Sequence, residues 1–115
     1  MRTFFAIALS IPAALAVATD AGAQSRDGKD RRIRVNNHTS QTMVALHGSS
    51  IRSKSWEENM IAGRPIRSGN SIMANFDIGN GECMFDLRAV FANGATSEKR
   101  RVNVCVEDTW TIVDR

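Results

Sequence analysis

Two cysteines and two histidines are the residues of this chain whose types could carry redox or metal chemistry. Cys83 and Cys105 are the only cysteines, and an even pair of thiols forms a disulfide where the compartment is oxidising. His38 and His47 lack the cysteine, histidine or carboxylate neighbours at the spacings that zinc sites use. Both histidines fall near the ends of expected strands, so we expect surface loop residues. The sequence therefore predicts a disulfide, no metal ligand and no cofactor.

An acidic, glycine-rich segment offers a second set of oxygen atoms. Asp77, Asn80 and Glu82 could supply oxygens to a calcium ion, but their spacing matches no established calcium loop. A polar turn that joins two strands is the expected structure. Serines are plentiful, yet the chain has no Gly-x-Ser-x-Gly sequence and no histidine placed as a general base. We therefore predict no catalytic residue and expect that the protein is not an enzyme.

Trp56 is the best candidate for an exposed binding residue, because tryptophan buries a large area when it binds. Ser55 and Glu58 have the spacing of a capping box, which predicts a short helix over residues 56–62. Trp56 and Met60 are four residues apart and share one face of that helix. Two interpretations stay open: the helix covers one end of the core, which we favour, or Trp56 is an exposed anchor.

In the second interpretation, the polar loop expected over residues 48–54 extends the surface around the tryptophan. We predict a possible interaction surface made of Trp56, Met60, Ser50, Arg52 and Lys54.

Alternating apolar and polar residues indicate strands over most of the chain after residue 31. The segment 83–91 has the longest alternation, with Phe85, Leu87 and Ala89 on one face, and is the best candidate for a central strand. The expected strands cover residues 32–36, 42–47, 71–76, 83–91, 96–106 and 110–112, the first two as a hairpin. Six short strands predict an all-β fold: a small antiparallel β-sandwich or barrel with one short helix and one disulfide.

The hairpin expected around the Asn-Gly pair at 93–94 bears on the disulfide. Asn-Gly favours a two-residue turn, which places Phe85 opposite Val102 so that their apolar faces agree. A one-residue bulge near Asn103 then brings the two cysteines together. Two free, buried thiols are the alternative.

Charged residues on this hairpin face away from the expected core. Asp86 and Arg88 alternate with the apolar residues of one strand, and Arg100 with Glu98 or Lys99 lies opposite them. We interpret them as cross-strand ion pairs on a solvated face rather than as a catalytic group.

The first 23 residues have the three parts of a secretory signal peptide. They begin with the positive Met1-Arg2, continue with an apolar stretch over 4–17 and end in the small residues 21–23. The apolar stretch is too short for a membrane span, and no later stretch is longer. We therefore expect a periplasmic or secreted protein with no membrane span.

After the signal peptide we expect a flexible basic N-terminal tail, residues 24–31, and one β-sandwich domain, residues 32–115. The net charge of +3 belongs to the region around the tail, because the charges from Val35 onward balance. No aromatic residues are interleaved with these basic residues, so we expect a solvated tail and no nucleic-acid partner. We expect a monomer.

Two sequence patterns are shared with a known family. The pattern Cys-x-aromatic-Asp-Leu-Arg-Ala occupies 83–89, Val-Asn-x-Cys occupies 102–105, and Val35-Asn36-Asn37, Trp56, Gly69 and Phe76 precede them in order. The chain resembles a family of small exported bacterial β-rich proteins of uncharacterised function, over nearly all of the part after the signal peptide. Two residues depart from the family pattern: Phe85 replaces a common tyrosine and Glu57 a common glycine.

Members of that family sometimes carry an inherited argininosuccinate lyase name. Gly48-Ser49-Ser50 followed by Lys54 has a faint likeness to the catalytic loop of the lyase superfamily. The Met-Pro and Asn-Pro of the lyase signature are absent, and those enzymes are large, mostly helical tetramers. We interpret residues 48–54 as a solvated loop.

The sequence favours an exported, non-enzymatic binding or interaction module for a protein or another envelope component. The alternative is a periplasmic inhibitor of an envelope-targeting enzyme such as lysozyme, which the size, the disulfide and the β content suit. The Ser-Gly-x-x-Tyr type of signature of one such inhibitor family is reduced here to Ser68-Gly69-Asn70, and the chain has no tyrosine.

Overall fold

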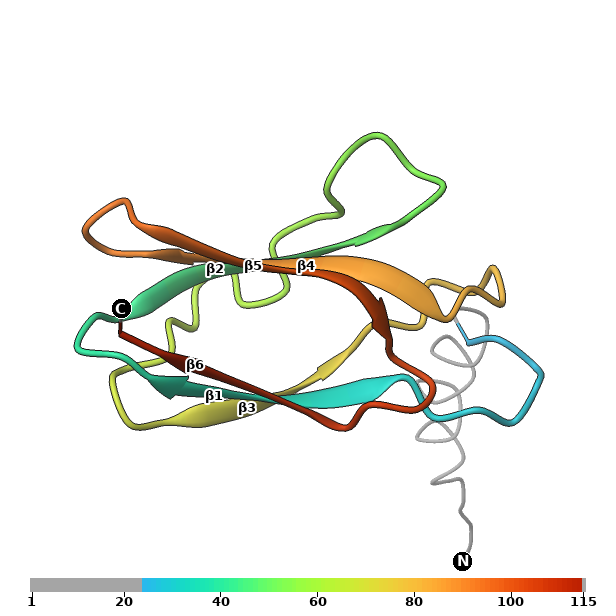
Figure 1. Cartoon of the computed structure of the whole chain (residues 1–115), viewed down its shortest axis with the longest axis horizontal. Helices are drawn as coiled ribbons and strands as arrows, with labels where there is room; N and C mark the ends of the chain where they lie inside the picture. The colour runs from blue at the N-terminus through green and yellow to red at the C-terminus, as the bar shows by residue number, and fades with distance from the viewer. Residues whose placement is uncertain (1–23, 115) are drawn as a thin grey trace, which may run out of the picture.

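The computed structural model describes residues 24–114, drawn in colour in Figure 1. The predicted signal peptide, residues 1–23, lies outside the described residues. The strands are β1 (Arg32–His38), β2 (Met43–Ser50), β3 (Ser71–Asn75), β4 (Met84–Phe91), β5 (Thr96–Asn103) and β6 (Thr109–Val113). All six predicted strands are confirmed, with small differences at their ends.

Two three-stranded sheets face each other as the two layers of Figure 1. One sheet has the order β3-β1-β6 and the other the order β2-β4-β5. All neighbouring strands are antiparallel except β1 and β6, which are parallel. The all-β prediction and the central place of β4 are confirmed. The fold is an open sandwich of one mixed and one antiparallel sheet, not a closed barrel.

The core lies between the two sheets and follows the alternation of the sequence. Phe85, Leu87 and Ala89 of β4 face Ile33 and Val35 of β1, all at most 1% exposed. Every second residue of a strand points to the same face, so these side chains meet in one apolar layer. The other core residues are Met43, Leu46, Ile61, Ala74, Phe76, Phe91, Val102, Val104, Trp110 and Ile112.

The predicted first hairpin is wrong, because β1 and β2 belong to different sheets. Asn37 is fully buried and directs the connection between them. Its amide oxygen accepts hydrogen bonds from the backbone and hydroxyl of Thr39, and its amide nitrogen donates to the carbonyls of Gln41 and Ile66. These hydrogen bonds of buried Asn37 fix the connection that leads from the β3-β1-β6 sheet to the β2-β4-β5 sheet. In isolation, the same polar residues would favour a hairpin turn.

The β4-β5 hairpin pairs Phe85 with Val102 as predicted, but reaches this register differently. Its loop has three residues, 92–94, because the N–H of Phe91 donates to the carbonyl of Ala95. The predicted bulge lies at 100–101, where two residues face Asp86, and not near Asn103.

The bulge is stabilised by the Asp86 carboxylate. Arg101 has a positive φ of 54°, which is uncommon for a residue other than glycine. Its N–H donates to Asp86 at 2.8 Å, and the guanidinium of Arg100 donates to the same carboxylate at 3.1 Å. The residue interpreted as part of a surface ion pair therefore also satisfies the backbone at the bulge.

The predicted disulfide between Cys83 and Cys105 is confirmed, with the two Cα atoms 5.3 Å apart. The N–H of Val104 donates to the carbonyl of Cys83, which holds the end of β5 against the start of β4. In a chain-entropy description, closing a loop of this size contributes on the order of 3 kcal/mol to stability.

The predicted helix over 56–62 is wrong. Residues 57–64, which we call the strap, run along the edge of β2 instead. The N–H of Glu57 donates to the carbonyl of Gly48, and the N–H of Met60 donates to that of Leu46. The Ser55 carbonyl accepts hydrogen bonds from the hydroxyls of Ser49 and Ser53, outside any capping box. Hydrogen bonds to β2 therefore replace those of a helix, because tertiary contacts override a weak local preference.

The expectation of a solvated loop over 48–54 is wrong for its first three residues, which belong to β2 and are buried. Gly48 is needed there because a Cβ atom would lie 2.6 Å from the ring of Phe76. Glycine and serine carry no apolar side chain, so the alternation that marks a strand is absent at these residues.

The expected solvated tail, residues 24–31, is also wrong in part, because Arg31 is only 2% exposed. Its guanidinium donates to the Asp27 carboxylate and to the carbonyls of Lys29, Gly81 and Glu82. All three nitrogens therefore have oxygen partners, as a buried guanidinium requires. We call this group of contacts the Arg31 clasp.

Asp77 joins the clasp from the loop after β3. Its carboxylate accepts the N–H and the hydroxyl of Ser25 and the N–H of Gly79, and lies 3.9 Å from Arg31. Burial raises the pKa of Asp77, but the hydrogen bonds and the nearby guanidinium outweigh it, so that the pKa lies below its ordinary value. The hydrogen bond from Arg31 likewise lowers the pKa of Asp27. Both carboxylates are therefore anions at neutral pH.

Candidate functional site

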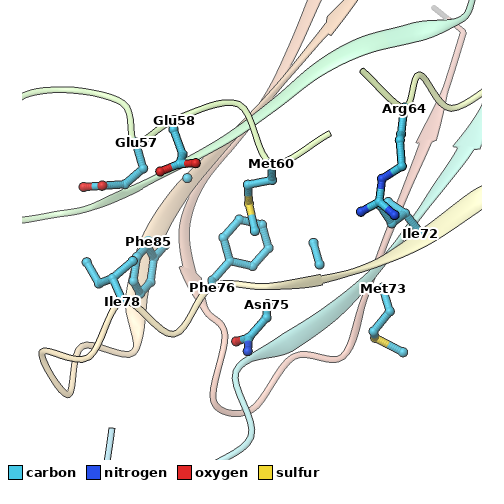
Figure 2. A pocket seen from close by; sticks show the side chains of 12 residues that line it. Glu57, Glu58, Met60, Arg64, Ile72, Met73, Asn75, Phe76, Ile78 and Phe85 are labelled. Atoms are coloured by element: carbon cyan, nitrogen blue, oxygen red, sulfur yellow. The ribbon is translucent and has the colours of Figure 1, made fainter. Parts of the chain in front are cut away.

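A hollow at the open side of the sandwich lies between β3 and the strap. We call this cavity of about 370 Å³ the β3 groove. It is lined by Gly48, Glu57, Glu58, Met60, Arg64, Ile72, Met73, Ala74, Asn75, Phe76, Ile78 and Phe85. In Figure 2 the strap residues Met60 and Arg64 lie across from Phe76 and Ile72, whereas Met73 and Asn75 project from the opposite side of β3.

The floor of the groove is apolar. The rings of Phe76 and Phe85 are 2% and 1% exposed, and their centroids are 6.2 Å apart in a tilted arrangement. Met60 packs against the core from the strap side, above Phe76 in Figure 2. Gly48 gives the Phe76 ring its space, as described above. A ligand side chain that enters here leaves water for an apolar surface.

Two large apolar side chains flank the groove and are accessible to solvent. Met73 of β3 is 47% exposed, and Ile78 in the following loop is 42% exposed. A single exposed apolar residue is ordinary on a protein surface, but each of these two lies beside the apolar floor of the groove and adds to its apolar lining. The groove is therefore suited to an apolar side chain.

The rim of the groove carries charges of both signs. Glu57 and Glu58 lie at the Ile78 end, and Arg64 lies at the Ile72 end (Figure 2). Among residues 24–114, the carboxylates of Glu57 and Glu58 and the guanidinium of Arg64 make no ion pair of 4.0 Å or less. These three charges are therefore available to a charged ligand.

Trp56 lies outside the core and outside the groove, so the favoured interpretation that it covers the core is wrong. The guanidinium carbons of Arg88 and Arg100 lie over its ring, 5.8 and 5.7 Å from the centroid. Arg100 forms an ion pair with Asp86 of β4 at 3.1 Å, which confirms a predicted cross-strand pair, and a second pair with Glu98 of its own strand at 2.6 Å. These contacts form a cation–π stack on the outer face of the β2-β4-β5 sheet.

The five residues of the predicted interaction surface do not form one surface. Met60 lines the groove, whereas Trp56 and Lys54 line a smaller hollow of about 160 Å³ on the outer face. Ser50 is 3% exposed at the end of β2. Arg52 forms an ion pair with Glu82 at 3.2 Å.

The residues considered as metal ligands lie apart or have partners within the chain. His38 is exposed at the end of β1. His47 lies within β2, contrary to the prediction of a loop, and its Nδ1 contacts the carbonyl of Glu57 at 2.8 Å. Asn80 accepts the N–H of Glu82, as in a polar turn. Within residues 24–114, no three His, Cys, Asp or Glu side chains are grouped as a metal site.

The same described part of the chain contains no helix with the length and hydrophobicity of a membrane span. Comparisons with protein-family models, curated proteins and solved structures found no match.

The sequence analysis missed most of the groove. The local sequence assigned Glu58 to a helix cap and Phe85 to the core, and gave Arg64 no role. Nothing in the sequence indicates that residues 57–64 lie beside residues 72–78. The one available signal was the apolar side chain of Met73 on the outward face of a predicted strand.

Proposed function

We propose that the protein is an exported, non-enzymatic binding module and that the β3 groove is its ligand site. The observation that supports this proposal is an apolar floor beside Glu57, Glu58 and Arg64, three charged side chains that form no ion pair within residues 24–114. Binding sites typically combine an apolar lining with a few polar groups that orient the ligand.

The side chains of the groove support binding rather than catalysis. Among the described residues, the lining contains no serine, threonine, cysteine or histidine, so it offers no hydroxyl, thiol or imidazole nucleophile. The hydroxyl of Ser49, part of the lyase-like tripeptide, donates to the carbonyl of Ser55 and lies outside the groove.

Export is supported by the predicted signal peptide and the disulfide. Disulfides persist in oxidising compartments such as the periplasm and the extracellular space. We propose one of these locations, and a protein or another envelope component as the partner.

The proposal is tested by capture of partners from an envelope extract on the immobilised, disulfide-bonded protein. The parent and Trp56→Ala should retain the same component, and Arg64→Glu should lose it, with all three proteins confirmed as folded by circular dichroism. Equal capture by Arg64→Glu and the parent, or loss in Trp56→Ala alone, would contradict the groove as the site. A captured muramidase that the protein inhibits would identify the enzyme inhibitor instead.

A further inference from the structure

One edge of β3 borders the groove and has no partner strand among residues 24–114. In this part of the chain, β3 pairs only with β1. The N–H of Phe76 donates to the carbonyl of Arg31, and backbone groups of alternate residues point to opposite sides of a strand. The backbone groups of Met73 and Asn75 therefore point away from β1, toward the open edge. No backbone hydrogen bond to another described residue uses them, so they can pair with an added strand.

The two edges at the open side of the sandwich differ. The strap closes the β2 edge, where the side chain of Asn59 also donates to the carbonyl of Val44 and accepts from the N–H of Leu46. No lysine or proline, the usual protections of an exposed edge, lies within β3. An extended peptide can therefore pair with the open edge of β3 while its own side chains enter the groove.

The charges of the rim give such a strand a direction. A strand antiparallel to β3 begins at the Ile78 end, next to Glu57 and Glu58, and finishes at the Ile72 end, next to Arg64 (Figure 2). A basic residue near its beginning and an acidic residue near its end complement these charges.

Resting on the proposed function, we propose that the β3 groove binds an extended peptide that adds a fourth strand to the β3-β1-β6 sheet. The peptide runs antiparallel to β3, with a basic side chain opposite Phe76, a branched apolar side chain opposite Ala74 and an acidic side chain opposite Ile72. Backbone hydrogen bonds then provide affinity, and the alternate side chains in the groove provide specificity.

The size of the site agrees with this ligand. The five residues 72–76 extend over about 13 Å at roughly 3.3 Å per residue, which matches five ligand residues with three side chains facing inward. Ala74 is the smallest residue of the wall, so the space opposite it suits the apolar side chain. A second copy of β3 would leave the groove unfilled, because its inward side chains already pack in its own core.

The probe is the peptide Thr-Lys-Thr-Leu-Thr-Glu-Thr with blocked ends, and its control is the isomer Thr-Glu-Thr-Leu-Thr-Lys-Thr. Calorimetric titration of the disulfide-bonded protein should show that the first peptide binds about tenfold more tightly than the isomer. The variant Glu57→Lys/Glu58→Lys/Arg64→Glu should reverse this preference. Equal binding of the two peptides would overturn the proposed direction.

The backbone contribution is tested separately at Met73. Met73→Pro removes an outward N–H without removing a hydrogen bond to β1, so it should weaken peptide binding roughly tenfold. Met73→Leu retains the N–H and should bind as the parent does. Both variants should have the same unfolding midpoint as the parent. If they then bind the peptide equally weakly, the effect belongs to the Met73 side chain, and strand addition is overturned.

Two other outcomes separate this inference from the proposed function. In one outcome, Arg64→Glu abolishes capture from the envelope extract, Met73→Pro does not, and the peptide fails to bind. This result would overturn strand addition and leave the groove as the ligand site. Dimers in analytical ultracentrifugation that Met73→Pro dissociates would show that a second copy occupies the edge.

Discussion

The Arg31 clasp and the β3 groove each contain one arginine and two carboxylates, but the charges have different partners in the two regions. In the clasp, Arg31 is 2% exposed and donates to the Asp27 carboxylate and to three carbonyls. In the groove, Arg64 and the two glutamates make no ion pair with each other or with other residues in 24–114.

This difference separates charges that stabilise the fold from charges that remain available to a ligand. A buried charge is tolerated only when its partners come from the protein, and removal of one partner leaves the other uncompensated. An accessible charge without a partner contributes little to stability. The clasp and the groove should therefore respond in opposite ways to substitution.

The largest effect is expected for Arg31→Ala. Loss of the buried guanidinium removes the donor of Asp27 and of three carbonyls, and the cation beside Asp77. The free energy of unfolding should therefore fall by about 3–5 kcal/mol. The matched control is Arg32→Ala, because Arg32 pairs with Asp30 on the surface and should lose only about 0–1 kcal/mol. Chemical denaturation measures both; equal losses would show that the clasp is no more than a surface ion pair.

Acid should weaken the clasp in a defined range of pH. The folded-state pKa values of Asp27 and Asp77 lie below the ordinary carboxyl value of 3.8, so their contribution is present above pH 3.8 and is lost as the pH falls below it. The stability advantage of the parent over Asp77→Asn should therefore shrink below that pH. An advantage that is independent of pH would exclude ionised Asp77 as its cause.

A smaller effect is expected for Trp56→Ala. Two cation–π contacts at a partly exposed site contribute about 1–2 kcal/mol together, and this should be the loss in unfolding free energy. Trp110→Ala is the comparison, since Trp110 is 7% exposed in the core and should lose about 3–5 kcal/mol. A loss of the larger size for Trp56→Ala would mean that its ring supports the core after all.

The smallest effect is expected in the groove. Glu57→Gln/Glu58→Gln removes two carboxylates without ion-pair partners among the described residues, so thermal and chemical denaturation should show a change within about 0.5 kcal/mol. Binding of the basic end of the peptide should nevertheless weaken. A stability loss comparable to that of Asp77→Asn would mean that these glutamates have structural partners, and the contrast between clasp and groove would disappear.

Local sequence patterns were sufficient to predict the six strands and the disulfide. The alternation of Phe85, Leu87 and Ala89 has the period of a strand, and that period depends only on neighbouring residues. To predict the disulfide, it was enough to know the approximate register of the β4-β5 hairpin and that both cysteines lie on the same face of it. The same local information placed Asp86 and Arg100 on the solvated face, where the structure pairs them.

Tertiary structure decided the paths of the segments that connect the strands. Because one of these segments, the strap, forms a wall of the candidate site, tertiary structure also decided where that site lies. The local sequence of residues 56–62 favours a helix, but hydrogen bonds to the β2 edge draw Glu57 and Met60 into the strap. Buried hydrogen bonds of Asn37 likewise separate β1 from β2. These partners are distant in sequence, so no local pattern contains them.

The sequence by itself therefore determined which segments form strands and which faces of the strands are apolar. Only the tertiary structure decided that Arg31 is buried and that Arg64 has no ion-pair partner among the described residues, although both are arginines in polar segments. The physical reason is that the environment of a charged side chain depends on the groups that folding brings around it, and the residue type specifies only the charge.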